Sequence, residues 1–328
     1  MFVMKQNLLK LTLCAACLCA GGLLARAAGL QRADVIADPV WLLHLDCDAL
    51  RTNALGQFVL AQMDKPEAKA RLASFQTIFG FDLRSQVHGV TLYGSSQKPA
   101  DSVLIIYADF DADRLMTLAK AANNYQSSPH HDHVIHSWVD ATKRGMTRRV
   151  YATFQDHRVI LGQRSDRVAA ALDVLDGTAP SLADRRSFSE LGLPGNHHFL
   201  EAAARKFDST NSAPNAAILK LAKSVQLVAG EKKQQFQGAL TLVANNDDAA
   251  GQMFSIAQGL VAVMRMQSNN PDAVKLANAV VITQDGSEIL GKLELPTNDL
   301  VEMFQAGAAR MTAARAEGRI SAHEAAPF

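Results

Sequence analysis

Four histidines and an aspartate lie within seven residues of this chain, in the sequence HHDHVIH at His130, His131, Asp132, His133 and His136. Neutral imidazole is a good ligand for zinc, copper and nickel, and a flexible turn can bring several rings to one ion. The alternative is a solvated polar loop in which His133 starts a strand. We favour the loop, because dedicated metal sites draw ligands from separate elements and fix them with a second shell.

A second group of potential ligands occurs earlier, in His44-Leu45-Asp46-Cys47-Asp48. If this segment is a strand, His44, Asp46 and Asp48 share one face, and His44 and Asp46 could complete a metal site with the later histidines. The alternative, which we favour, places His44 on the polar face of a strand and uses Asp46 or Asp48 to cap the following turn.

The motifs of common catalytic sites are absent. The chain contains no G-x-S-x-G, H-E-x-x-H or G-x-G-x-x-G. Gly286 to Lys292 imitates a phosphate-binding loop, but Leu293 stands where a Ser or Thr would hold magnesium. We therefore expect a protein that is not an enzyme and that needs no cofactor, with a divalent transition metal as the alternative.

The elements that must position these residues follow one repeated design. Two extended apolar stretches and a polar exit precede a helix with apolar residues at i, i+3, i+4 and i+7, which indicates ββα units. Four such segments occur, at 87–122, 150–175, 225–260 and 280–307.

Each pair of units follows a predicted strand and helices. Val40 to Leu45 precedes helices near 52–79, and His198 to Ala203 precedes a helix near 214–223. The hairpins of the second and fourth units have similar local sequences, in which Gln155 and Gln284 occupy the same place, 129 residues apart. These features predict an α+β fold formed by tandem duplication of a βα-ββα-ββα unit.

The fold prediction includes the arrangement and the boundaries of the two halves. Short hairpins favour largely antiparallel sheets with helices packed on one face, and the pattern leaves open whether two sheets stay separate or join. We expect a first half at 28–177, a connection at 178–196 and a second half at 197–310. A tail at 311–328 lacks a clear apolar face and is expected to fray.

One predicted helix has an unusual composition. The segment 248–266 is apolar over more than half its circumference and carries Met253, Met264 and Met266. This pattern favours a central core helix, and the alternative is a Met-rich surface for an adaptable partner.

The N-terminus has the features of a signal peptide. Lys5 and Lys10 precede an uncharged run from Leu11 to Leu24, and Ala25-Arg26-Ala27 offers a cleavage site. The run of 14 residues is shorter than the roughly 20 residues of a membrane-spanning helix. We expect residues 1–27 to be removed, leaving an exported protein of the periplasm or the extracellular space without a stable membrane anchor.

Composition limits the class of partner. Of the 33 basic residues, three precede residue 28, so a mature chain carries 30 basic against 32 acidic residues. A nearly neutral chain without a basic block lacks the electrostatic footprint of a nucleic-acid-binding protein. Cys47 alone would remain of the four cysteines, which excludes an intrachain disulfide.

Several short features resemble a loose group of uncharacterised exported bacterial proteins. They are Ala33-Asp34, the Trp-x-x-His-x-Asp stretch from Trp41 to Asp46, Asp285-Gly286, and the Leu-x-Leu-Pro exit from Leu293 to Pro296. The resemblance implies a signal peptide and an α+β mature chain, and it implies no activity.

The sequence therefore predicts a binding or assembly scaffold whose partner is a protein or a small hydrophobic ligand. The alternative is a periplasmic metal-binding protein or metal-dependent hydrolase that uses His130, His131, His133 and His136.

Overall fold

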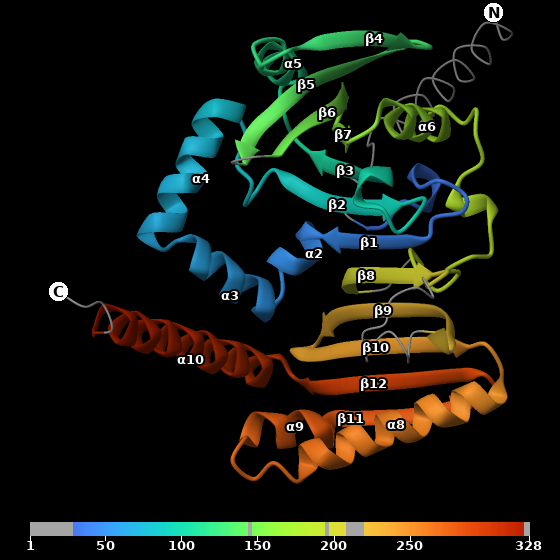
Figure 1. The fold of residues 1–328 in the computed structure, drawn as a ribbon, viewed down its shortest axis with the longest axis vertical. Coiled ribbons are helices and arrows are strands. Elements are labelled where there is room, and N and C mark those ends of the chain that lie inside the picture. Colours follow the sequence, from blue (N-terminus) through green and yellow to red (C-terminus); the bar gives the residue numbers. More distant parts are fainter. Residues whose placement is uncertain (1–28, 144–145, 194–196, 208–219, 325–328) are drawn as a thin grey trace, which may run out of the picture.

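The computed structural model of the protein describes residues 29–143, 146–193, 197–207 and 220–324. At its centre is one antiparallel sheet of 12 strands (Figure 1). In chain order the strands are β1 (Trp41–Asp46), β2 (Val87–Gly94), β3 (Ser102–Ala108), β4 (Gln126–His130), β5 (His133–Lys143), β6 (Met146–Gln155), β7 (Arg158–Gly162), β8 (His198–Arg205), β9 (Ala222–Lys232), β10 (Gln235–Ala244), β11 (Val280–Asp285) and β12 (Glu288–Pro296).

Helices occupy the connections between these strands. The α-helices of the described residues are α2 (Cys47–Arg51), α3 (Ala54–Met63), α4 (Pro66–Phe79), α5 (Ala112–Lys120), α6 (Ser165–Leu175), α8 (Asp247–Arg265), α9 (Pro271–Ala279) and α10 (Thr297–Glu324). Three short 3-10 helices are η1 (Arg32–Asp34), η2 (Pro99–Asp101) and η3 (Leu182–Asp184). The predicted signal peptide and most of the helix expected near 214–223 lie outside the described residues, and Ala222 and Lys223 begin β9.

The two predicted halves share a single sheet. The strand order is β11-β12-β10-β9-β8-β1-β2-β3-β7-β6-β5-β4, and the junction is the antiparallel pair β1 and β8. Outward from this junction, the orders β1-β2-β3-β7-β6 and β8-β9-β10-β12-β11 match element by element. The matching order favours the predicted duplication, which stays a prediction.

The two similar hairpin sequences that indicated the repeat are out of register by one residue. Gln155 is the last residue before the β6–β7 turn and pairs with Arg158. Gln284 lies one residue further from the β11–β12 turn and pairs with Ile289. Because successive side chains of a strand alternate between faces, the two glutamines are not equivalent.

Helices lie on both faces of the sheet, which corrects the expectation of one covered face. On β3, Ile105 packs in the cluster that contains α6, whereas Ile106 packs in the cluster that contains α5. We name these the α6 face and the α5 face. Residues that are paired across neighbouring strands lie on the same face of a sheet. The pairing can be followed from β3 through β2, β1, β8 and β9 to β10, and it places α8 on the α5 face.

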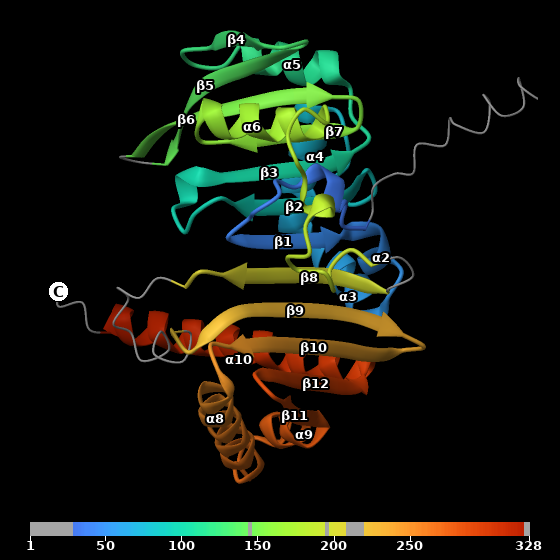
Figure 2. The same ribbon diagram turned by 90° about the vertical axis from the view of Figure 1, so that its right-hand side faces the viewer.

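The last helix of each half goes to a different side of the sheet. After β7, α6 packs on the α6 face through Val168 and Leu172. After β12, α10 contacts α3, behind the sheet in the view that has α6 in front (Figure 2). No described helix therefore covers the α6 face of the second half. The helix α10 continues to Glu324, through the segment that was expected to fray.

Short polar side chains begin several of the helices, as the sequence indicated. Asp46 ends β1 and accepts a hydrogen bond from the third residue of α2, and Asp111 does the same for α5. The predicted capping role of Asp46 is confirmed. The helix α6 differs, since it begins at Ser165 and Arg164 stands at the cap position without a side-chain hydrogen bond.

The helix α8 is not the central core helix that its composition favoured. It buries Ala249, Ala250 and Met253 in its first two turns. Leu260 and Val263 in the remaining turns are 59% and 57% exposed. The apolar residues of the second half of α8 therefore do not contribute to the core, which periodicity alone could not show.

Candidate functional site

A cavity of about 470 Å³ lies on the α5 face, between α4, α5 and strands β3, β5, β6 and β7. Protein interiors are normally packed with few voids larger than a water molecule, whereas ligand pockets have volumes of roughly 300–1,000 Å³. Its lining is apolar: Phe75, Ile78, Phe79, Phe81, Ile106, Leu115, Leu118, Ala119, Ala122, Trp138, Phe154, Val159 and Leu161. We call this space the aromatic cavity.

Three phenylalanines at the end of α4 form one wall of the aromatic cavity. Phe75 stacks on Phe79 with ring centroids 4.3 Å apart, and it meets Phe81 edge-on at 5.2 Å. Phe81 is only 6% exposed, whereas Ile78, one turn after Phe75, is 51% exposed. The wall is therefore buried at Phe81 and open to solvent near Ile78.

The end of α4 is held by hydrogen bonds from Arg114, whose side chain packs closely against Gly80. Gly80 ends the helix in the left-handed region, with φ 87°, where glycine is favoured. Arg114 of α5 donates hydrogen bonds to the carbonyls of Thr77 and Ile78. A Cβ at Gly80 would lie 2.7 Å from Cδ of Arg114. The contact between α4 and α5 thus needs glycine at this position.

The opposite wall contains Trp138 and Phe154, and behind Phe154 lies a buried histidine. The His136 ring stacks on Phe154 at 5.7 Å, and its Nδ1 is 2.9 Å from the hydroxyl of Tyr125. Burial, followed by the charge of Lys120, lowers the pKa of His136. His136 supports the wall of the aromatic cavity and points away from the other histidines of its cluster, because β5 alternates its side chains between faces.

A second apolar hollow of about 430 Å³ lies on the same face in the other half. It is lined from β10, β12 and β11, among others by Leu242, Ile289 and Ile282, and by Ala257 of α8. Counted outward from the junction of β8 and β1, strands β10, β12 and β11 occupy the places in the second half that β3, β7 and β6 occupy in the first half. The second hollow also extends over Leu200 of β8 and over Leu227 and Ala229 of β9, so the two hollows coincide only in part of the strand order.

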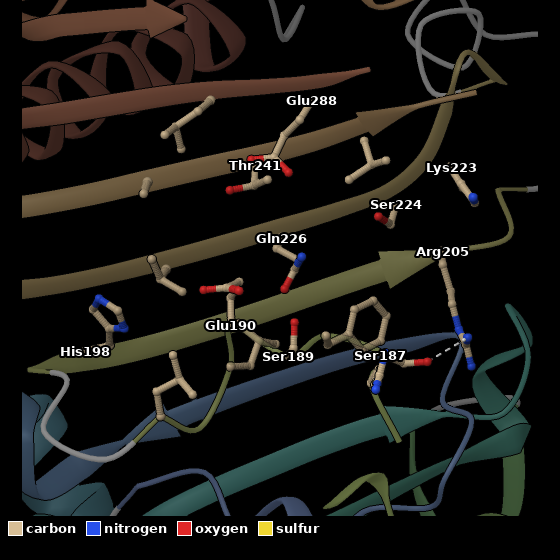
Figure 3. Close-up of a pocket in the computed structure, with 18 residues that line it drawn as sticks. Ser187, Ser189, Glu190, His198, Arg205, Lys223, Ser224, Gln226, Thr241 and Glu288 are labelled. Carbon is tan, nitrogen blue, oxygen red and sulfur yellow. Dashed lines mark hydrogen bonds between the residues drawn. The ribbon is translucent and has the colours of Figure 1, made fainter. Parts of the chain in front are cut away.

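On the α6 face, the uncovered part of the second half forms a cleft of about 790 Å³ that is lined by both polar and apolar side chains. We call it the polar cleft, because the other two hollows are almost wholly apolar. Figure 3 shows Arg205 and Lys223 at one end of this cleft and His198 at the other. Nδ1 of His198 and Oε1 of Gln226 are buried without a hydrogen-bond partner. The cleft can hydrogen-bond a polar ligand, and it exists because α10 lies on the other face.

No motif in the sequence indicated this cleft, because its lining comes from segments that are distant in the chain. Arg205 is already engaged, since it donates hydrogen bonds to the carbonyl of Pro39 and to Asp38. The cleft is lined by basic, acidic and hydroxyl side chains, so its lining does not define one ligand charge.

His44 and Asp46 do not join the later histidines. His44 is 1% exposed and its Nδ1 lies 2.9 Å from Oγ1 of Thr91 in the core beneath η1. Strands β2, β3, β7 and β6 separate β1 from β5, which corresponds to roughly 24 Å at the usual strand spacing. This separation excludes a metal site that combines His44 or Asp46 with the histidines at 130–136. The sequence could not show it, because sheet order is non-local.

The four histidines of the cluster are themselves divided. His130 and His131 meet Asp173 of α6, and the three donor atoms lie within 4.8 Å of one another. His133 lies 2.9 Å from Asp176, also near the end of α6. His136 packs behind Phe154 on the other face of the sheet, so only part of the predicted set shares one place.

Glu201, which pairs with His44 across strands β8 and β1, has a buried carboxyl group. It is 5% exposed and accepts a hydrogen bond of 2.6 Å from the Gly192 N–H. Burial raises the pKa of Glu201; the Gly192 bond opposes this shift, the Asp46 charge adds to it, and Arg32 opposes it.

A raised carboxyl pKa means that the folded state binds more protons than the unfolded chain, so stability falls as pH rises from about 4.5 upward through the folded pKa. Glu201→Gln should therefore gain stability relative to the native protein between pH 4 and pH 7. Urea unfolding of both proteins at the two pH values measures this difference. A difference that stays constant, or that shrinks with pH, would contradict the prediction.

The fold and these hollows define a mixed α+β protein built on one antiparallel sheet. The sequence matches no family model and no curated protein. Among solved structures, it is similar to crystal form III of TP0453, with a TM-score of 0.47 and 9% identity over 85% of this chain and 99% of that chain. Crystal form I of TP0453 gives a TM-score of 0.45, also at 9% identity, over 85% of this chain and 98% of that chain.

Hydropathy adds one observation. None of the helices in the described part of the chain has the length and apolar character needed to cross a membrane.

Proposed function

We propose that this protein binds a small amphiphilic molecule with a long aliphatic chain, and that the chain lies in the aromatic cavity. The observation that carries the proposal is a ligand-sized space lined by five aromatic rings and by aliphatic side chains. Displacing water from such a surface contributes roughly 25 cal/mol per Å² of apolar area removed from solvent. Because the lining offers few polar groups, the cavity suits a hydrocarbon chain whose polar end stays at the solvent-facing mouth.

The structure of the mouth supports an amphiphilic ligand over a wholly apolar one. Ile78 is half exposed at the end of α4, so one side of the space opens to water. The apolar hollow of the second half offers a second place for a ligand of the same class. The role is that of a binding protein, since the aromatic cavity contains no pair of groups suited to acid-base catalysis.

Tryptophan fluorescence tests the proposal, because one of the chain's two tryptophans lines the cavity. Trp41→Phe leaves Trp138 as the single emitter. A bromine-labelled dodecanol should quench this emission in a saturable titration, since bromine quenches on contact, and unlabelled dodecanol should reverse the quenching.

Two neighbouring alanines provide a matched pair of variants in the same background. Ala122 lines the cavity, whereas Ala121 is exposed and does not. Ala122→Phe should lower the affinity for the alcohol at least tenfold, and Ala121→Phe should leave it unchanged. Thermal unfolding confirms that both variants fold. Equal binding by the two variants, or quenching that never saturates, would refute the proposal.

A further inference from the structure

A second candidate site lies on the α6 face of the same half, where the β4–β5 hairpin meets the end of α6. Nε2 of His130 lies 2.7 Å from Oδ1 of Asp173, and Nε2 of His131 lies 3.3 Å from the same oxygen. The two imidazole rings are side by side, with centroids 4.4 Å apart. Two imidazoles and a carboxylate from two separate elements thus converge on one point.

We propose that His130, His131 and Asp173 form a binding site for a divalent transition-metal ion of the zinc class. Zinc takes imidazole nitrogens and carboxylate oxygens at about 2.0–2.2 Å, so ligand atoms in a tetrahedral site are roughly 3.3 Å apart. The His131–Asp173 separation already has this value, and all three atoms lie within 4.8 Å. Small side-chain rotations are enough to bring them to one ion.

The turn between the strands explains how adjacent residues can both face Asp173. His130 pairs with His133, so His131 and Asp132 form a two-residue turn. His131 has φ 50°, a left-handed conformation in which glycine or asparagine is usually found. This conformation turns the second ring back beside the first.

A neighbouring pair anchors the hairpin on α6. His133 lies 2.9 Å from Asp176, one helical turn after Asp173, and the side-chain amide of Gln155 donates to Nδ1 of His133. Oγ1 of Thr178 donates to the carbonyl of Asp173 and holds the end of α6. His133 therefore positions the site and is not one of its ligands, which is the arrangement that supporting residues give to metal ligands.

The exposed fractions of the three side chains show how an ion would reach the site. His130 and Asp173 are 22% and 31% exposed, whereas His131 is 61% exposed. Water can therefore fill the remaining coordination positions from the side of His131. Three protein ligands and an open side suit zinc, nickel or cobalt better than calcium, which takes six to eight oxygens.

Zinc titration of the full chain without an affinity tag, followed by calorimetry, tests this site. We expect one ion per chain. His131→Gly removes a ligand and also relieves the left-handed backbone, so the turn should persist, and Asp173→Asn keeps a hydrogen-bond acceptor while it removes the carboxylate. Each variant should lower the affinity at least tenfold.

The matched control is His157→Ala, because His157 is an imidazole that is 61% exposed in a different turn. This variant should bind zinc as the native chain does, and thermal unfolding without zinc should show that all variants fold. Weak binding at several sites, or affinity that His131→Gly and Asp173→Asn leave unchanged, would overturn the proposal. The result is independent of ligand binding in the aromatic cavity, since the two sites share no residue.

Discussion

Replacing Arg32 by alanine is expected to lower the free energy of unfolding by about 3–5 kcal/mol, because hydrogen bonds from a charged group are each worth roughly 1.5–3 kcal/mol and several part-buried carbonyls would lose their partner. The guanidinium of Arg32 donates to the backbone carbonyls of five residues: Leu182, Arg185, Ser187, Phe188 and Leu191. These carbonyls belong to the segment that joins the two halves.

The same substitution should release that segment from the sheet. Leu182 and Leu191 are completely buried, so they would lose their packing when the backbone moves. Urea unfolding measures the loss of stability, and limited proteolysis should show cleavage between 178 and 193. Arg32→Lys should restore only part of the effect, since an ammonium cannot reproduce the planar fork of five donors.

Arg148→Ala provides the comparison, because Arg148 is 52% exposed and forms a surface ion pair with Asp140. Such pairs contribute about 0–1 kcal/mol. If Arg32→Ala cost no more than Arg148→Ala, the connection would not depend on Arg32.

Phe81→Ala is the second substitution with a large expected effect, again about 3–5 kcal/mol, which is the usual range for a buried phenylalanine. Phe81 is 6% exposed and meets Phe75 edge-on at 5.2 Å. Its loss would enlarge the aromatic cavity and remove support from the end of α4. We expect bromine-labelled dodecanol to restore part of this stability, since a ligand that binds only the folded state stabilises it.

Phe304→Ala is the matched control, since Phe304 of α10 is 50% exposed. Its effect should stay within about 0.5 kcal/mol, as for most surface substitutions. Thermal unfolding of both variants with and without the alcohol gives the comparison. A Phe81→Ala protein as stable as the native chain would show that this wall does not form.

The sequence predicted those elements whose pattern is local. Apolar alternation located strands such as β3 and β7, and short polar residues such as Asp46 located helix starts. It did not predict β4, which has the sequence QSSPH, because an edge strand can be polar throughout and can accommodate Pro129. Its histidines were therefore assigned to a turn and not to a hairpin packed on α6.

The sites depended on contacts between distant segments, which no local pattern contains. Phe81 and Phe154 are 73 residues apart in the chain, and only the order of β3, β7 and β6 brings them to one cavity. Asp173 lies 43 residues after His130, and its helical environment gave no sign of a ligand. A periodic stripe shows that a helix has an apolar side, but not which face of the sheet that side meets.

A crystal structure of the protein grown with bromine-labelled dodecanol tests the central claim most directly, because anomalous scattering locates the bromine. We predict a bromine position inside the aromatic cavity, between α4, α5 and the strands that carry Ile106 and Phe154. Bromine only in the second hollow or the polar cleft, or none at a saturating concentration of the alcohol, would contradict the proposed function.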